Sequence, residues 1–216
     1  MSHFSVYVFS KDRDVEELLA PYNEELVVAP YIKYTKEQAI EKIRNDIEKF
    51  KNNYYAEYLK DPIAYKEKCT NESHINYIEN EFPKKLNWTD EECYQEMRSW
   101  YDDDDDLIDA NGNIWATYNP NSKWDWYNTG GRWNGCLKTK DGKETNEDLV
   151  SEIDFDKTPV PFAFVDPLGR WYERGEMGLW AIVTNEKDKD DWETQYKNFV
   201  ASLNGNETLT VVDCHI

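Results

Sequence analysis

One set of side chains that could do chemistry stands at the two ends of the chain. His3 stands near the start, and Asp213 and His215 stand near the last residue. Imidazole and carboxylate groups are common metal ligands, and histidine exchanges protons near neutral pH. If the two ends meet, the three residues could hold a metal ion or work as an acid–base pair. The alternative is two histidines on the polar face of an edge strand, with Cys214, the best soft ligand nearby, alternating to the opposite face.

A tryptophan-rich segment, NPNSKWDWYNTGGRW at 119–133, is the second candidate site. Three interpretations are open: a structural aromatic loop, a surface that binds a protein, and a ligand pocket. In the pocket, aromatic faces would stack on a base or sugar, while Arg132 and the neighbouring glycine amides would receive an anionic group. The segment has neither GxxxxGK[ST] nor GxGxxG spacing, so a phosphate loop is not expected. The pocket residues would be Trp124, Trp126, Tyr127, Gly130, Gly131, Arg132 and Trp133.

Acidic side chains dominate the charge of the chain. There are 44 aspartates and glutamates against 25 lysines and arginines, which gives a net charge of −19. This charge repels phosphate backbones and anionic lipids, and so argues against direct binding to nucleic acid or to a membrane. It either keeps the protein in solution or docks on a basic protein groove in competition with nucleic acid. The predicted acidic interaction surface comprises Glu91, Glu92, Asp102, Asp103, Asp104, Asp105, Asp106 and Asp109.

The same acidic stretch does not have the spacing of a calcium-binding EF-hand. Aligning Asp109, Asn111 and Gly112 with that loop puts Leu107 at the first ligand position, and no glutamate stands at the twelfth. A looser cation site within 102–106 stays an alternative.

The spacing of apolar residues predicts an α+β fold built from both ends of the chain. Apolar and polar positions alternate at the start, and the last third reads as two strands, a helix and a final strand. With a short helix after the first strand, the order is βαββαβ, which is that of a ferredoxin-like antiparallel sheet. We therefore expect a ferredoxin-like core from 1–30 and 158–216. Its elements would lie at 3–9, 14–21, 161–166, 179–184, 190–203 and 208–216.

Residues 31–157 form a large insertion in this scheme. Thr35 is the predicted N-cap of a helix at 36–58, and Thr89 with Glu92 predicts a capping box for a helix at 89–101. A Trp-rich β-hairpin region is expected at 107–145, with a turn at Asp141-Gly142.

The ferredoxin-like order makes a geometric prediction about the two chain ends. The last strand should lie antiparallel beside the first. His3 and Tyr7 would then share one face of the sheet with Asp213 and His215. The other face would pack against the helices and comprise Phe4, Val6, Val8, Val212, Cys214 and Ile216.

The chain has none of the sequence features of export or membrane insertion. Its first ten residues lack a basic start and a long apolar run, and no stretch of eighteen apolar residues follows. The four cysteines lack C-x-x-C spacing, so free thiols and a cytoplasmic location are expected. No Ser-His-Asp, Cys-His or HExxH arrangement can be read from the sequence, so no cofactor is indicated and a non-catalytic role is favoured over an enzyme.

Several segments together resemble an uncharacterised family of small proteins that occurs in tailed phages, prophages and bacterial genomes. They are MSHFSVYV followed by LLAPYNEEL, the central YNPNSKWDWYNTGGRW, the segment GRWYERGEMGLWAIV, and the closing TVVDCHI. The family has no established activity. Its distribution implies a small phage accessory protein, and acidic proteins of that kind often bind and block a host protein.

We therefore expect an acidic protein–protein interaction module, located in the host cytoplasm if a phage encodes it. Its partner would be a host or defence protein with a basic, nucleic-acid-binding surface. Inhibition would work by nucleic-acid mimicry, of the anti-CRISPR or another anti-defence type. The alternative is a small-ligand binding protein or enzyme, for a nucleotide or sugar, that uses the pocket residues.

Overall fold

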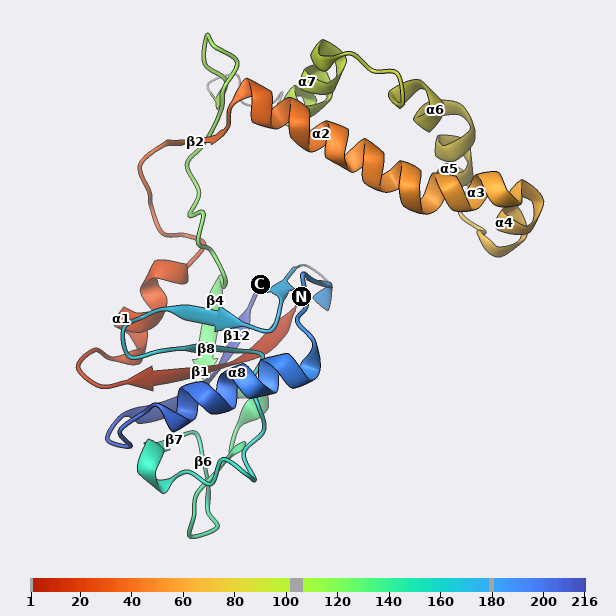
Figure 1. Ribbon diagram of the computed structural model, residues 1–216. Coiled ribbons are helices and arrows are strands. Elements are labelled where there is room, and N and C mark those ends of the chain that lie inside the picture. The colour runs from red at the N-terminus through yellow and green to blue at the C-terminus, as the bar shows by residue number, and fades with distance from the viewer. Residues whose placement is uncertain (1, 102–106, 179–180) are drawn as a thin grey trace. The chain divides into compact units, whose positions relative to one another are not determined.

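The computed structural model describes residues 2–101, 107–178 and 181–216, and the chain forms two compact α+β units. The first unit comprises Met1–Val28 and Tyr118–Ile216, and the second is Ala29–Thr117 (Figure 1). Residues 118–157, which we had assigned to the insertion, therefore belong to the unit that contains both chain ends. Among the described residues, no helix combines the length and the apolar character needed to cross a membrane.

The first unit is organised around a mixed sheet with the order β4-β12-β1-β8-β9, in which β7 also pairs with β12. The first and last strands are antiparallel neighbours, with His3 opposite His215, as predicted. β1 also pairs in parallel with β8, which forms an antiparallel hairpin with β9. The strands are β1 (His3–Ser10), β4 (Trp126–Thr129), β7 (Glu147–Leu149), β8 (Ala163–Val165), β9 (Trp171–Glu173) and β12 (Thr208–His215).

The ferredoxin-like order is not confirmed. That order inserts a strand between the two parallel strands that the first helix connects, whereas here β1 and β8 pair in parallel with no strand between them. The outer hairpin strand is β9, which we had not predicted. The strand expected at 179–184 is represented by β11 (Val183–Thr184), which pairs with β10 (Glu176–Met177) in a separate two-stranded sheet. Residues 179–180 lie outside the described residues.

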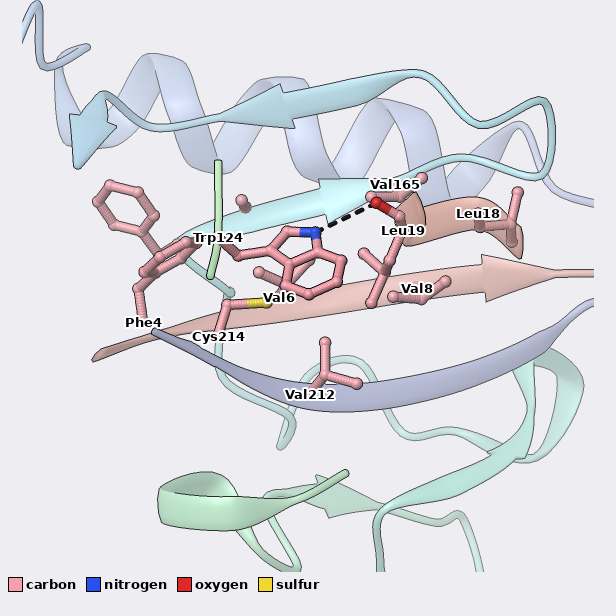
Figure 2. Close-up of a cluster of buried hydrophobic side chains, with 11 residues drawn as sticks. Phe4, Val6, Val8, Leu18, Leu19, Trp124, Val165, Val212 and Cys214 are labelled. Carbon is pink, nitrogen blue, oxygen red and sulfur yellow. Dashed lines mark hydrogen bonds between the residues drawn. The ribbon is translucent and has the colours of Figure 1, made fainter. Parts of the chain in front are cut away.

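One face of the sheet packs against α1 (Val15–Leu19). Its buried cluster contains the apolar positions of β1 and β12 that were predicted to face the helices, together with Leu18 and Leu19 (Figure 2). Trp124 lies in this cluster with only 6% of its surface exposed, and its indole Nε1 donates to the Leu19 carbonyl at 3.1 Å. The strand residues are Phe4, Val6, Val8, Val212 and Cys214, with Ile216 partly buried beside them.

The opposite face packs against α8 (Lys189–Ala201). Trp192 and Tyr196 of this helix are buried against Tyr7, Phe9 and their neighbours on β12. The two helices therefore lie on opposite faces, whereas we had expected both on one face. Covering both faces explains why β1 is buried along its whole middle section despite the polar residues in its sequence.

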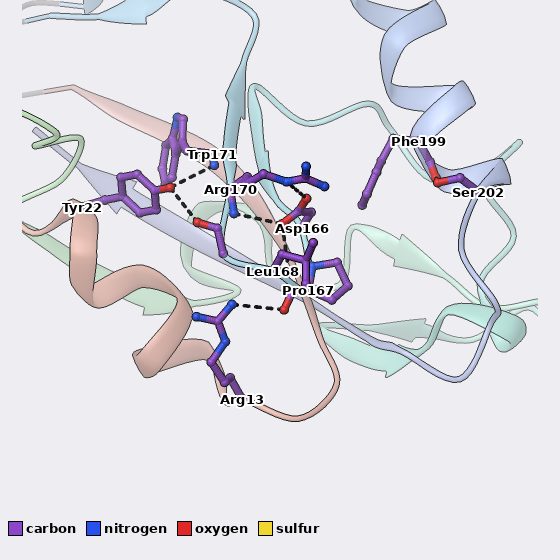
Figure 3. A network of polar contacts seen from close by, with 10 residues as sticks. Arg13, Tyr22, Asp166, Pro167, Leu168, Arg170, Trp171, Phe199 and Ser202 are labelled. Carbon is purple, nitrogen blue, oxygen red and sulfur yellow. Dashed lines mark hydrogen bonds and ion pairs between the residues drawn. The ribbon is translucent and has the colours of Figure 1, made fainter.

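The turn between β8 and β9 is held by polar contacts (Figure 3). Asp166 is buried, accepts from the Leu168 and Arg170 amides, and forms an ion pair with the Arg170 side chain at 2.6 Å. The Tyr22 hydroxyl donates to the Gly169 carbonyl at 2.7 Å and accepts from the Trp171 amide at 3.0 Å. These bonds fasten the hairpin to the short 3-10 helix η1 (Ala20–Tyr22) that follows α1.

Smaller elements complete the first unit. The turn predicted at Asp141-Gly142 connects β5 (Leu137–Lys138) to β6 (Glu144–Thr145). Two further 3-10 helices are η5 (Gly131–Trp133) and η6 (Val150–Glu152).

The second unit is mainly helical. The Thr35 and Thr89 capping boxes are both present, at the starts of α2 (Lys36–Phe50) and α7 (Asp90–Ser99). The helix predicted at 36–58 continues from α2 through a π-helical turn, η2 (Lys51–Tyr55), into α3 (Ala56–Lys60). The remaining elements are α4 (Pro62–Lys68), α5 (Glu72–Asn76), the π-helical η3 (Tyr77–Glu81), α6 (Phe82–Lys85), and the antiparallel pair β2 (Tyr31–Tyr34) and β3 (Ile114–Ala116).

Candidate functional site

Three neighbouring strands place three rings in one row across the sheet of the first unit. Trp126 of β4 pairs in register with His215 of β12, and His215 pairs with His3 of β1. The centroids of the two imidazoles are 5.0 Å apart, and the Trp126 ring stacks on His215 at 5.0 Å with an interplanar angle of 16°. Trp126 is 45% exposed, while the histidines are largely buried. We call His3 and His215 the imidazole pair.

Asp213 contacts the imidazole of His3. It lies two residues before His215 and therefore on the same face of β12. Its Oδ1 is 2.8 Å from His3 Nδ1, and its Oδ2 accepts from the backbone amide of Arg132 at 3.0 Å. With only 4% of its side chain exposed, the carboxylate has both oxygens engaged. The prediction that His3, Asp213 and His215 come together on one face is confirmed.

The glycine pair after β4 allows this contact. Gly131 has a positive φ of +50°, and a Cβ at this position would overlap the Asp213 side chain. Gly130 also has a positive φ, +73°, and its amide donates to the Val211 carbonyl at 2.9 Å. The Gly130 amide, one of the two glycine amides expected to receive an anion, is thus bound within the protein.

Asp125 contacts the imidazole of His215. It was not among the site residues predicted from the sequence. Its two carboxylate oxygens lie 2.7 and 2.9 Å from His215 Nδ1, and its amide donates to the His215 carbonyl at 3.0 Å. Asp125 stands between two tryptophans in a segment that we had placed in the insertion. In the sequence, its position beside Trp126 was the single feature that pointed to a role for Asp125. The pairing of β4 with β12 brings it close to His215.

Besides Nδ1, which Asp125 binds, the ring of His215 has a second nitrogen, Nε2. Nε2 of His215 is buried and makes no hydrogen bond to any of the described residues. A buried polar atom without a partner costs about 1–3 kcal/mol, so such atoms are usually bound by water or a ligand. Because the carboxylate occupies Nδ1, Nε2 is the ring nitrogen of His215 that can exchange a proton with another molecule.

The imidazole pair is not arranged as a metal centre. Within 2–101, 107–178 and 181–216, no group of three or more His, Cys, Asp or Glu side chains is placed to hold a metal ion. Asp213 and Asp125 each bind a different histidine. Cys214 points into the cluster beneath α1, where burial raises the pKa of its thiol well above the ordinary range, so the thiol stays protonated.

The predicted pocket residues do not form one pocket. Trp124 is a core residue, and Tyr127 packs against the same cluster beneath α1. Trp133 packs against the other cluster, beneath α8. Of the predicted pocket residues, Trp126 packs its ring on the imidazole pair, and Arg132, which is exposed, donates its backbone amide to Asp213.

The described members of the acidic surface have structural contacts of their own. Glu91 pairs with Lys36 at 3.0 Å, and Glu92 completes the capping box of α7. Asp109 accepts from the amides of Asn111 and Asn113 and from the Trp115 indole. The run at 102–106 and the alternative cation site assigned to it lie outside the described residues.

Comparison with known proteins identifies no relative. No protein-family model, no curated protein and no solved structure matches the chain. The functional inference therefore rests on the geometry of the chain itself.

Replacing Gly131 by alanine should destabilise the first unit more than the same change at Gly142. Both positions have positive φ, so both variants bear the strain of about 1–2 kcal/mol that a left-handed alanine brings. A Cβ at 142 meets no atom within 4 Å, whereas a Cβ at 131 displaces Asp213. Urea denaturation should show the larger loss for Gly131→Ala, together with changed nitrogen chemical shifts of His3. Equal losses would contradict the proposed close contact.

The pKa of Asp109 should be far below that of an ordinary aspartate. Hydrogen bonds from Trp115 and Asn113 lower it from 3.8 to about 2, because they stabilise the charged carboxylate. The contribution of Asp109 to the stability of the second unit is therefore fully present above pH 3.8 and lost as the pH falls through about 2. Carboxyl-carbon NMR should give this midpoint directly, and Asp109→Asn should remove this part of the acid sensitivity. A midpoint near 3.8 would refute the assignment.

Proposed function

We propose that the first unit binds a small molecule at the imidazole pair and transfers protons on it. The observation that carries the proposal is the buried Nε2 of His215, which has no partner among the described residues while its Nδ1 is held by Asp125. Buried polar atoms in proteins nearly always have a hydrogen-bond partner, so we infer that another molecule binds Nε2.

Each histidine of the imidazole pair has the groups that a proton transfer needs. In each case a carboxylate lies within hydrogen-bond distance of Nδ1, which orients the ring. A neutral ring then accepts a proton at Nε2, while a protonated ring donates one from Nε2. With centroids 5.0 Å apart, the two rings are close enough to contact one ligand together.

Trp126 indicates the kind of ligand. Its ring stacks on His215 and is 45% exposed, so it offers a flat apolar surface at the edge of the site. Such a surface suits the face of a base or a sugar ring. A nucleoside or sugar is the substrate class we propose, with Arg132 exposed close to Asp213 for a negatively charged substituent.

A second proposal follows from the charge of the chain. Acidic residues outnumber basic ones 24 to 13 in the first unit and 20 to 12 in the second. We propose that this excess lets the protein, as a phage-type accessory protein, dock on the basic surface of a host or defence protein and displace nucleic acid. Charge complementarity of this kind accelerates association and weakens with salt.

The imidazole-pair proposal can be tested by ligand screening with matched histidine variants. Nucleosides, nucleotides and sugars are added to the wild type, to His215→Gln and to His74→Gln, which alters the histidine of the second unit. A ligand at a hundred times its dissociation constant should add about 2.7 kcal/mol to the stability of a protein that binds it. We expect the gain, measured by thermal shift, in the wild type and in His74→Gln only. Absence of any gain, or an equal gain in folded His215→Gln, would reject the site.

The acidic-surface proposal predicts a strong dependence on salt. A host protein captured at low ionic strength should be released as ionic strength rises, because the Debye length shortens from about 30 Å at 0.01 M to about 3 Å at 1 M. Exchanging the five aspartates at 102–106 for asparagine should slow association, as measured by surface plasmon resonance. His215→Gln is the control, since it leaves these charges unchanged. Capture that does not respond to salt would contradict this proposal.

A further inference from the structure

The second unit contains an aromatic cavity that the proposals above do not use. It has a volume of about 220 Å³ and opens between α2, the η3–α6 segment and α7. Its walls include Phe50 at the end of α2, Tyr77 at the start of η3, and Trp88 and Trp100 at the two ends of α7. All of these residues belong to the same unit, so the cavity does not depend on how the two units are arranged.

Two π-helical turns border the cavity. One begins directly after Phe50, and the other begins at Tyr77. π-helical turns are rare and are frequently found at functional sites, because they displace side chains from regular helical positions. Here the Phe50 ring lies edge-on to Tyr77, with centroids 5.2 Å apart, and 4.5 Å from Phe82. The rings of Phe50, Tyr77 and Phe82 therefore pack together along one side of the cavity.

One partly buried ion pair supplies the polar side of the cavity. Lys85 donates to Glu96 at 2.7 Å, and its ammonium lies 4.6 Å from the centroid of the Trp88 ring. The Lys85 side chain is 19% exposed. Burial acts to lower the pKa of Lys85, but Glu96 and Tyr77 outweigh it and the pKa is raised, so the ammonium stays charged. An ammonium has three donors, and Glu96 and Tyr77 are hydrogen-bond partners for two of them, which leaves one for a ligand.

These features select a ligand by size and charge. An engineered cavity of about 150 Å³ binds benzene, so a cavity of 220 Å³ fits one or two fused rings. An anion would meet the Asp46 and Glu96 carboxylates, and a cation would meet the Lys85 ammonium. A neutral ring avoids charge repulsion from either kind of group and can accept a hydrogen bond from Lys85. We propose that this cavity binds a neutral heteroaromatic molecule of one or two rings, with a hydrogen-bond acceptor directed at Lys85.

Quinoline and indole are matched probes for this site, because they have similar size and only quinoline carries a ring acceptor. Titration of the full chain, followed by protein NMR, should show saturable binding of quinoline at up to about 1 mM. A hydrogen bond to a charged donor should make quinoline bind about tenfold more tightly than indole. Lys85→Met should remove that difference. No saturable binding, or no preference for quinoline in the wild type, would overturn the proposal.

A second pair of variants locates the bound probe. Ile47→Phe places a larger side chain at the cavity wall, whereas Glu41→Phe places the same side chain on an exposed position of α2. We expect Ile47→Phe to weaken quinoline binding at least tenfold and Glu41→Phe to leave it unchanged. If Ile47→Phe does not fold, nuclear Overhauser contacts between quinoline and the Phe50 and Trp88 rings of the wild type decide the question. Contacts to other residues, or undiminished binding to folded Ile47→Phe, would refute this location.

Discussion

The antiparallel pairing of the first strand with the last is the constraint on which the first unit depends. Eight successive residue pairs join β1 to β12, from His3 opposite His215 to Ser10 opposite Thr208. A shift of one residue would turn every side chain of one strand to the other face. The same register therefore sets the apolar cluster beneath α1, the second cluster beneath α8, and the meeting of the two histidines. The candidate site is a consequence of strand register and not of a local motif.

A polar site at the end of a buried sheet needs partners for its polar atoms. Removing an imidazole or a carboxylate from water is unfavourable unless it gains hydrogen bonds. Here each imidazole has a carboxylate on Nδ1, and Asp213 receives a further amide hydrogen from Arg132. By contrast, Nε2 of His215 is a buried atom without a hydrogen-bond partner among the residues that the structure describes. The tryptophan-rich segment contributes one carboxylate, one stacking ring and the glycine turn, so its unusual composition serves this site as well as the core.

The two units carry different kinds of candidate site. The first unit offers acid–base groups beside a partly exposed indole, and the second offers an aromatic cavity with an internally neutralised ion pair. The acidic excess is spread over both units, and the described acids of the predicted interaction surface are also used in helix capping and turn formation. The net charge of the chain thus does not point to either candidate site. Both sites are recognised from individual contacts between named side chains.

The sequence by itself determined the features that depend on near neighbours along the chain. The alternation in β1 predicted its two faces, the threonines at 35 and 89 predicted the starts of α2 and α7, and matching alternation at the chain ends predicted that His3 and Asp213 share a face. Apart from the pairing of β1 with β12, only the tertiary structure decided which strands are neighbours. Whether β8 or a later strand lies beside β1, and whether Asp125 reaches His215, depends on how both faces of the sheet are covered by helices distant in sequence. Local patterns state which face of an element is apolar, but many partners can cover an apolar face, and the choice among them is made by packing of the whole unit.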